Sequence, residues 1–361
     1  MKYTKLIDCW NDAIKNKISL ADLKKECKGN HPSLTSIVFT RECFMRCKHC
    51  CYPIANCRDI ESGNLERIDK VIDATYKVGN RDLIHIGRIL KKEHLPILKK
   101  YQDKGMSINL IDNGGGQKFV KDIKEIGLFF DGGIDVSVDG TKESHEAQRG
   151  LGTYALATSG IEAFKDVADH IAITATASAL NFDTIVQGLL NLKEKYPYIK
   201  TLQITTTAPM KTQNQRMHLT KEEMTEIFHN LLKLSHKNPP RLLIYRNDDL
   251  MAIIDELMKH GKPEFKHIHM EWKIGNLIVA YFPESIVAAE EFAIDANGRH
   301  ILPFGLDHHL DERPEDWEMN DDLILTDPDK SYELLVDKLF RVRGNERFEQ
   351  EKRVFEKYDL I

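Results

Sequence analysis

Five of the seven cysteines stand close together between residues 43 and 57. Three of them, Cys43, Cys47 and Cys50, follow the spacing C-x3-C-x2-C, with Cys51 and Cys57 just beyond. Thiolates bind zinc and iron–sulfur clusters. A structural zinc site usually takes its four ligands from two separated pairs, whereas this chain has one group. Three thiolates on a four-iron cluster leave one iron without a protein ligand, and that iron then has a position for reaction.

Spacing alone leaves two other interpretations of these cysteines open. Cys51, Cys57 or His49 can complete a zinc knuckle, or the thiols can pack in a buried turn without a metal. The group directly follows the apolar, β-branched run at 35–40. The place of that run in the fold therefore bears on the choice.

Composition limits the classes of partner. The chain has 361 residues, is 42% hydrophobic and 30% charged, and carries a net charge of -5 with both signs interspersed. Nucleic acid is therefore not expected as the main partner. No apolar run approaches the roughly 18 residues that span a bilayer, and the start has no signal-peptide pattern, so no membrane partner is expected. We expect a cytoplasmic protein, where clustered cysteines indicate metal binding or catalysis rather than disulfides.

Strand-like and helix-like segments alternate from residue 35 to 207. The predicted strands are 35–40, 82–87, 106–113, 133–140, 170–178 and 199–207. The predicted helices are 64–79, 93–105, 116–127, 153–167 and 182–196. This alternation is typical of a parallel sheet covered by helices. About six β/α units fall short of the eight in a closed barrel, so the sequence predicts an α/β fold with a partial (β/α)6 barrel. Chemistry gathers at the carboxyl ends of such strands, and the cysteines follow the first of them.

The pattern changes after Thr207. Helices are predicted at 220–237, 248–261, 330–342 and 349–358, and β-hairpins at 271–282 and 291–302, where Gly275–Asn276 and Asn297–Gly298 mark the turns. We therefore predict a smaller α+β C-terminal region. The expected domains are an N-terminal helical extension at 1–34, the partial barrel at 35–207, and the C-terminal region at 208–361.

A C-x3-C-x2-C loop after the first strand of a six-fold β/α series resembles the radical SAM (S-adenosylmethionine) enzymes. The resemblance runs from about residue 35 to 207, roughly half of the chain. The segment "DVSVDGTKESHEAQRG" (135–150) is similar to the fourth-strand segment of the SPASM-containing branch, in which S-x-D-G is followed by His and Arg-Gly. "MSINLIDNGG" (106–115) resembles a third strand that typically ends in T-N-G.

The resemblance implies a cofactor set. Cys43, Cys47 and Cys50 would ligate a [4Fe–4S] cluster, and the amino and carboxylate groups of SAM would chelate its open iron. An electron from a reductant such as flavodoxin or ferredoxin would then cleave SAM to a 5′-deoxyadenosyl radical, which removes hydrogen from a substrate carbon. The implied cofactor-binding residues are His49, Gly87, Asn113, Ser137, Arg149 and Asn181. Within this set, His49 would lie beside the adenine and Arg149 would pair with the methionyl carboxylate, since its planar fork suits that anion.

Two departures from the family pattern bear on function. The second strand commonly ends in G-G-E-P, whereas this chain has "HIGRIL" (85–90), which keeps Gly87 and places Arg88 where the acid would be. A cation cannot accept hydrogen bonds from an ammonium group, so backbone carbonyls near Gly87 would take over that role. "FAIDANGRHILPFGLDHH" (292–309) resembles the first hairpin of a SPASM domain, yet Phe304 stands where a cysteine would follow Pro303. No auxiliary cluster is therefore expected, which disfavours a net two-electron oxidation.

Two functions follow from these features. The first is a radical SAM enzyme that acts on a small natural-product intermediate or a peptide with a redox-neutral outcome, such as epimerisation, elimination or decarboxylation, rearrangement or radical addition. The alternative is a non-catalytic iron–sulfur or zinc-binding protein on a degenerate radical SAM scaffold.

Overall fold

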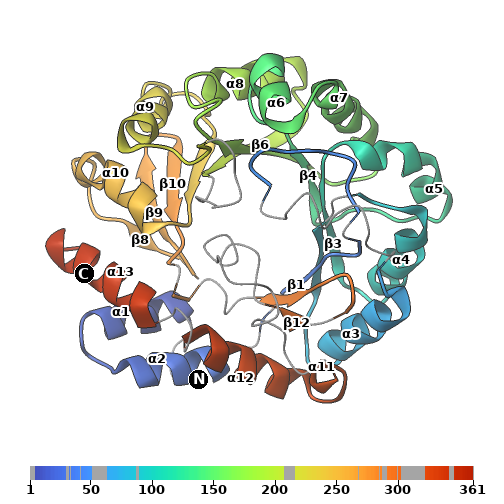
Figure 1. Cartoon of the computed structure of the whole chain (residues 1–361), viewed down its shortest axis with the longest axis horizontal. Helices are drawn as coiled ribbons and strands as arrows, with labels where there is room; N and C mark the ends of the chain where they lie inside the picture. Colours follow the sequence, from blue (N-terminus) through green and yellow to red (C-terminus); the bar gives the residue numbers. More distant parts are fainter. Residues whose placement is uncertain are drawn as a thin grey trace.

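The strands form a single curved sheet with helices around its outside (Figure 1). The computed structural model describes residues 5–29, 32, 34–40, 42–50, 63–86, 89–206, 216–266, 268–283, 285–286, 291–298, 300–301, 322–340 and 345–360. Twelve strands in these residues follow the order β12-β11-β1-β2-β3-β4-β5-β6-β7-β10-β9-β8. The sheet has two edges, so the barrel is open, as the sequence predicts.

The six predicted β/α units form the centre of its parallel part. The strands are β1 (Leu34–Ile37), β2 (Asp82–Ile86), β3 (Ser107–Asp112), β4 (Gly133–Ser137), β5 (Ile171–Ala177) and β6 (Ile199–Thr206). The helices are α3 (Leu65–Lys77), α4 (Leu95–Asp103), α5 (Val120–Glu125), α6 (Lys142–Arg149), α7 (Thr153–Phe164), α8 (Ile185–Lys195) and α9 (Lys221–Leu232). Two short 3-10 helices precede α4 and α5, at η2 (Lys92–His94) and η3 (Gly115–Phe119). The predicted α/β partial barrel is confirmed.

Strands from the C-terminal region lengthen the same sheet at both ends. Beyond β6 lie β7 (Arg241–Ile244), β10 (Leu277–Tyr281), β9 (Met270–Ile274) and β8 (Glu264–Phe265), and α10 (Asn247–Met258) follows β7. Beyond β1 lie β11 (Glu291–Ile294) and β12 (His300–Ile301). Both predicted hairpins are present as antiparallel pairs, and Gly275 and Gly298 adopt the positive φ that their turns require. The division into three domains stays a prediction.

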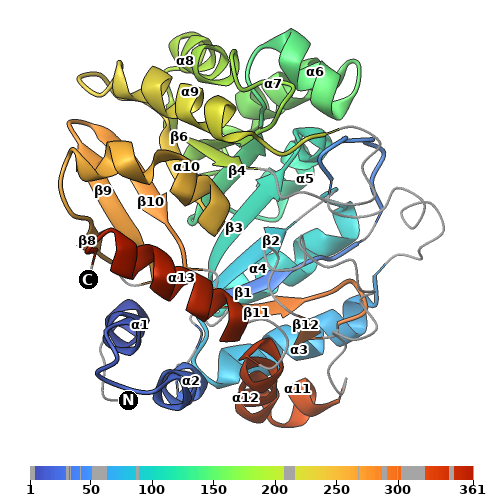
Figure 2. The ribbon, with the colours of Figure 1, turned by 60° about the vertical axis from the view of Figure 1, so that its left-hand side comes forward.

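Helices from the two ends of the chain cover the open side of the barrel (Figures 1 and 2). They are α1 (Leu6–Ile14), α2 (Leu20–Gly29), α11 (Leu323–Thr326), α12 (Pro328–Leu339) and α13 (Asn345–Lys357). Trp10 Nε1 donates to Glu351 Oε2 at 2.9 Å and to Ser285 Oγ at 3.0 Å, and all three residues are fully buried. This contact fastens the first helix to the last. No helix in the described part of the chain is long and apolar enough to cross a membrane.

The two faces of the central strands differ in chemistry. Ile134 and Val136 of β4 and Ile173 of β5 are buried in the hydrophobic core. Successive side chains of a strand point to opposite faces, so the alternate residues face the barrel interior. These inward residues are partly exposed and polar on three adjacent strands: Asp135 and Ser137 on β4, Thr174 and Thr176 on β5, and Thr201, Gln203 and Thr205 on β6. Barrel interiors are usually filled by bulky branched side chains, so a polar wall suits a binding surface.

Candidate functional site

The cysteine loop follows β1 and is held from two sides. Cys43, Cys47 and Cys50 are partly buried, and Cys50 N donates to the carbonyl of Cys47 at 3.2 Å. On one side, Lys91 Nζ pairs with Glu42 Oε1 at 2.7 Å. On the other side, the backbone N–H of Lys48 donates to the carbonyl of Gln148 at 2.8 Å, which joins the loop to α6.

The three thiols fit an iron–sulfur cluster. Burial raises the pKa of Cys47 to about 12; Arg149 opposes this rise, and the nearby Cys50 and Cys43 add to it. The thiols therefore interact with one another, yet within the described ranges no three His, Cys, Asp or Glu side chains are grouped to hold a single metal ion. Each thiolate of a cluster binds a different iron, so a cluster does not require the three thiols to converge on one ion. Cys51 and Cys57 lie outside the described residues.

Asp139 is the centre of a buried polar network beside this loop. The side chain is fully buried and accepts hydrogen bonds from Arg149 Nε at 2.5 Å and Nη2 at 3.0 Å. It also accepts from Gln148 Nε2 and from the backbone N–H of Thr176, both at 2.9 Å. Burial acts to raise the pKa of Asp139, but Arg149 and then His49 outweigh it and lower the pKa to about 2. Burial acts to lower the pKa of Arg149, but the charge of Asp139 and its hydrogen bond to Arg149 outweigh burial, so the pKa of Arg149 is raised. The two side chains therefore form a charged, buried pair at neutral pH.

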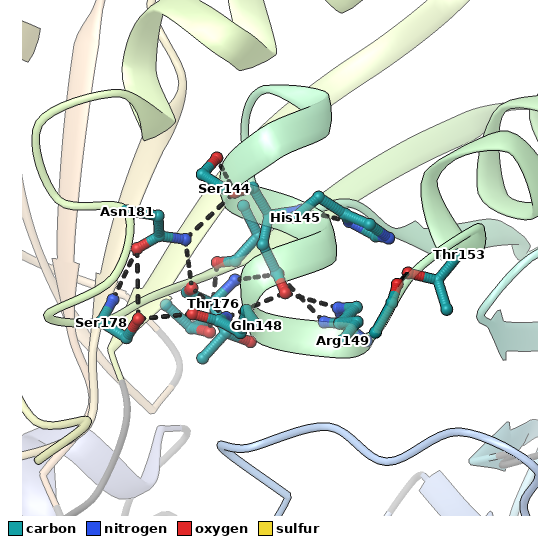
Figure 3. A network of polar contacts seen from close by, with 12 residues as sticks. Ser144, His145, Gln148, Arg149, Thr153, Thr176, Ser178 and Asn181 are labelled. Carbon is teal, nitrogen blue, oxygen red and sulfur yellow. Dashed lines mark hydrogen bonds and ion pairs between the residues drawn. The ribbon is translucent and has the colours of Figure 1, made fainter. Parts of the chain in front are cut away.

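The network continues through the loop after β5. Asn181 Nδ2 donates to the carbonyls of Asp139 at 3.1 Å and Thr176 at 3.0 Å, while its Oδ1 accepts from the N–H of Ser178 at 2.8 Å. The hydroxyl of Ser178 bonds to Gln148 Oε1. Figure 3 shows Gln148 and Arg149 of α6 turned toward the same centre as Ser178 and Asn181. These hydrogen bonds thus join the carboxyl ends of β4 and β5 to helix α6, next to the cysteine loop.

The sequence between β4 and α6 explains this local geometry. Gly140 adopts a φ of 102°, which disfavours other residues, and it turns the chain from Asp139 into α6. A Cβ at Gly188 of α8 would lie 2.3 Å from the carbonyl carbon of Gly140, so only glycine lets α8 approach the turn. Thr141 then caps α6 by accepting from the N–H of Ser144.

The other predicted cofactor residues occupy the carboxyl ends of neighbouring strands. Asn113 directly follows β3, is buried, and its Oδ1 accepts from the N–H of Gly115 at 2.9 Å. Ser137 is the last residue of β4 and faces the interior. His49 lies in the cysteine loop, close enough for its charge to act on Asp139. The remaining predicted residue, Gly87, lies outside the described residues, as does Arg88.

The structure thus groups Cys47, His49, Arg149 and Asn181 around Asp139. The sequence analysis assigned no role to Asp139 itself. It also missed Gln148, Thr176 and Ser178. A signal for Asp139 was present, because it is the acid of the S-x-D-G segment and precedes the glycine that turns the chain.

No family model and no curated protein sequence matches the chain, but solved structures do. One is native anSMEcpe with bound AdoMet and Cp18Cys peptide, at 15% identity over 88% of this chain and 82% of that chain, with a TM-score of 0.56. Streptococcus suis SuiB bound to its precursor peptide SuiA matches at 12% identity over 85% of this chain and 68% of that chain, with a TM-score of 0.58. SuiB bound to S-adenosylmethionine matches at 11% identity over 89% and 76%, with a TM-score of 0.56.

These structures are radical SAM enzymes with partial barrels, and this chain has their fold. The resemblance predicted from the sequence is therefore confirmed at the level of the fold.

Proposed function

We propose that this chain is a radical SAM enzyme in which Cys43, Cys47 and Cys50 hold a [4Fe–4S] cluster. When bound, such a cluster supplies the electron that cleaves SAM and so starts hydrogen abstraction from a substrate carbon. The observation that carries the proposal is the C-x3-C-x2-C loop, placed at the end of β1 and joined by Lys48 to the Asp139–Arg149 network. The fold shared with SAM-bound structures supports it.

We assign Arg149 to binding the carboxylate of SAM. Two of its nitrogens, Nε and Nη2, donate to Asp139, which leaves Nη1 for a second anion. Asp139 fixes the plane of the guanidinium, so little side-chain entropy remains to be lost when a carboxylate arrives. Asn181 donates hydrogen bonds to the carbonyls of Asp139 and Thr176. We propose that it fixes the conformation of the loop after β5, beside SAM. His49, Gly87, Asn113 and Ser137 complete the proposed cofactor site.

For the substrate we propose a small natural-product intermediate or a peptide. Among the similar structures, anSMEcpe and SuiB each have a bound peptide. Since the sequence has no cysteine after Cys57, an auxiliary cluster has no thiolate in the C-terminal region. We therefore favour a redox-neutral outcome, of the isomerase, lyase or transferase type, with a one-electron donor such as flavodoxin or ferredoxin as the reductant.

Anaerobic reconstitution with iron and sulfide tests the proposal. The wild-type chain should bind about four irons and form 5′-deoxyadenosine from SAM under reductant. Cys47→Ala should lose both properties. Cys27→Ala is the matched control, because Cys27 is buried in α2, away from the loop, and should keep both. Full iron content in Cys47→Ala would overturn the ligand assignment. Bound zinc without SAM cleavage in the wild type would instead support a non-catalytic protein on a degenerate scaffold.

A further inference from the structure

A second acid, Asp135, lies on the inward face of β4 and is not part of the Asp139 network. The hydroxyl of Thr174 on β5 lies 2.7 Å and 2.8 Å from its two carboxylate oxygens. Gln203 Nε2 on β6 donates to Asp135 Oδ2 at 2.9 Å and to Thr174 Oγ1 at 2.7 Å. Three adjacent strands thus each contribute one side chain to a closed cluster on the polar inner wall.

The donors of this cluster are all used within it. A threonine hydroxyl has one proton to donate and a glutamine amide has two, whereas an ionised carboxylate only accepts. The hydroxyl of Thr174 donates its proton to Asp135. The amide of Gln203 donates one proton to Asp135 and the other to Thr174. What remains toward the barrel interior is a set of acceptors, namely the other lone pairs of Asp135 and Oε1 of Gln203. A ligand at this wall must therefore bring donors.

The cluster also carries a charge that no ion pair among the described residues neutralises. Asp139, four residues along the same strand and loop, pairs with Arg149 at 2.5 Å. Asp135 forms no ion pair with any residue that the structure describes; its polar partners are Thr174 and Gln203, and the imidazole of His170 acts on it through space. Buried charges in proteins are normally paired. Burial raises the pKa of Asp135 to about 6, so the carboxyl is mostly ionised at neutral pH.

We propose that Asp135, Thr174 and Gln203 form the substrate anchor, and that the anchor takes a cationic amine or guanidinium group. This inference rests on the proposed function, because it relates the anchor to SAM. Ser137, where SAM is proposed to bind, lies two residues further along the same face, about 7 Å toward the carboxyl ends of the strands. A substrate held by its cation at Asp135 then presents carbon atoms a few bonds away to the proposed position of SAM. The substrate class is an amine- or guanidine-bearing molecule, such as an amino sugar or a basic peptide side chain.

Calorimetry with small probes tests the anchor on the full-length reconstituted protein. The probes are N-acetyl-lysine methylamide, N-acetyl-arginine methylamide and the neutral N-acetyl-norleucine methylamide, which has nearly the shape of the lysine probe. We expect at least one cationic probe to bind tenfold or more tightly than the neutral one, and the preferred probe distinguishes an amine from a guanidinium substrate. Asp135→Asn should abolish the preference. The matched control is Asp166→Asn, an exposed acid paired with Lys124, which should leave it unchanged.

The pH dependence gives a second readout. The cationic probe binds the ionised carboxylate, and the pKa of Asp135 lies at about 6, so its affinity should fall about tenfold from pH 7 to pH 5. The Asp135→Asn protein should show a flat profile. His170 directly precedes β5 and acts on Asp135 through its charge. A His170→Gln variant therefore identifies the titrating group, because the fall in affinity should remain in that variant if Asp135 is the group that titrates.

Equal binding of cationic and neutral probes by the wild-type protein overturns the anchor, as does a preference that survives in Asp135→Asn. Failure of the proposed function looks different. A protein that cleaves SAM but shows no preference for cations keeps the proposed function and loses this inference. A protein that prefers the cationic probe but does not cleave SAM keeps a cation site and loses the radical SAM function.

Discussion

Replacing Asp139 with Asn removes one charge from a pair that is 0% and 9% exposed, while the size of the side chain hardly changes. The variant leaves the guanidinium of Arg149 buried without its counter-charge. Breaking a buried pair by removing one partner costs about 3–5 kcal/mol. We therefore expect Asp139→Asn to destabilise the fold by that amount at pH 7. The pKa of Asp139 is lowered to about 2 in the folded chain, so its contribution is present above pH 3.8 and is lost only as the pH falls toward 2. The destabilisation should thus be constant between pH 5 and pH 8.

Asp135→Asn is the matched comparison on the same strand, and the expected sign is opposite. The pKa of Asp135 rises from 3.8 to about 6, so folding is penalised once the carboxyl ionises. A rise of two units corresponds to about 3 kcal/mol. Because Asp135 stays partly accessible, we expect Asp135→Asn to stabilise the fold by about 1–3 kcal/mol at pH 7.5. The penalty develops between pH 3.8 and pH 6, so the gain should be about half as large at pH 5 and should disappear only below pH 3.8.

Urea unfolding followed by circular dichroism measures both effects, provided that the slope of the transition is the same in all proteins. The exposed pair Lys124–Asp166 supplies a baseline, since Asp166→Asn should change the stability by less than about 1 kcal/mol. Two results would refute the reasoning. The first is an Asp139→Asn protein within 1 kcal/mol of the wild type, and the second is an Asp135→Asn protein less stable than the wild type at pH 7.5.

Three further predictions concern other parts of the chain. Arg149→Lys keeps the charge but loses the planar fork, so equilibrium dialysis should show SAM affinity reduced by about 1.5–3 kcal/mol with iron content unchanged; unaltered affinity would confine Arg149 to a structural role. Cys51→Ala and Cys57→Ala should each retain about four irons, since the proposed function leaves the open iron to SAM; loss of the cluster would indicate a fourth thiolate ligand. Glu351→Gln should weaken the contact with Trp10 by about 1.5–3 kcal/mol, seen as faster amide exchange in α1, and unchanged exchange would contradict the role of this contact.

Much of the barrel could be predicted because hydrophobic periodicity determines its elements. The strands of the six units and both hairpins are found within a few residues of the predicted ranges. Thr220 and Glu223 form a capping box at the start of α9. Helix α6 was not predicted as a separate helix. Its buried residues are Ser144, His145, Gln148 and Arg149. Since those side chains are polar, hydrogen bonds to Asp139 rather than an apolar stripe hold this helix in place, and apolar periodicity cannot reveal it.

The polar inner wall was visible in the sequence in part. Apolar and polar residues alternate in "GIDVSVD" at 133–139, "ITATAS" at 173–178 and "TLQIT" at 201–205. The polar residues of these runs that belong to the strands lie on the inward face. What the sequence could not supply is the register that places Thr174 opposite both Ser137 and Gln203. Only the register shows that Asp135 meets neutral partners while Asp139 meets an arginine.

The hairpin that resembles a SPASM hairpin has a structural reason to persist without its cysteine. Its first strand, β11, pairs in parallel with β1, the strand that leads into the cysteine loop. The N–H of Val38 donates to the carbonyl of Ile294 at 2.9 Å, so the pairing continues past the end of β1 toward Cys43. An uncovered edge at β1 would leave the backbone groups next to the cysteine loop unpaired. Loss of the hairpin would expose the strand that leads into the cysteine loop. The pairing with β11 is therefore a structural reason for this hairpin that does not depend on a metal at its far end.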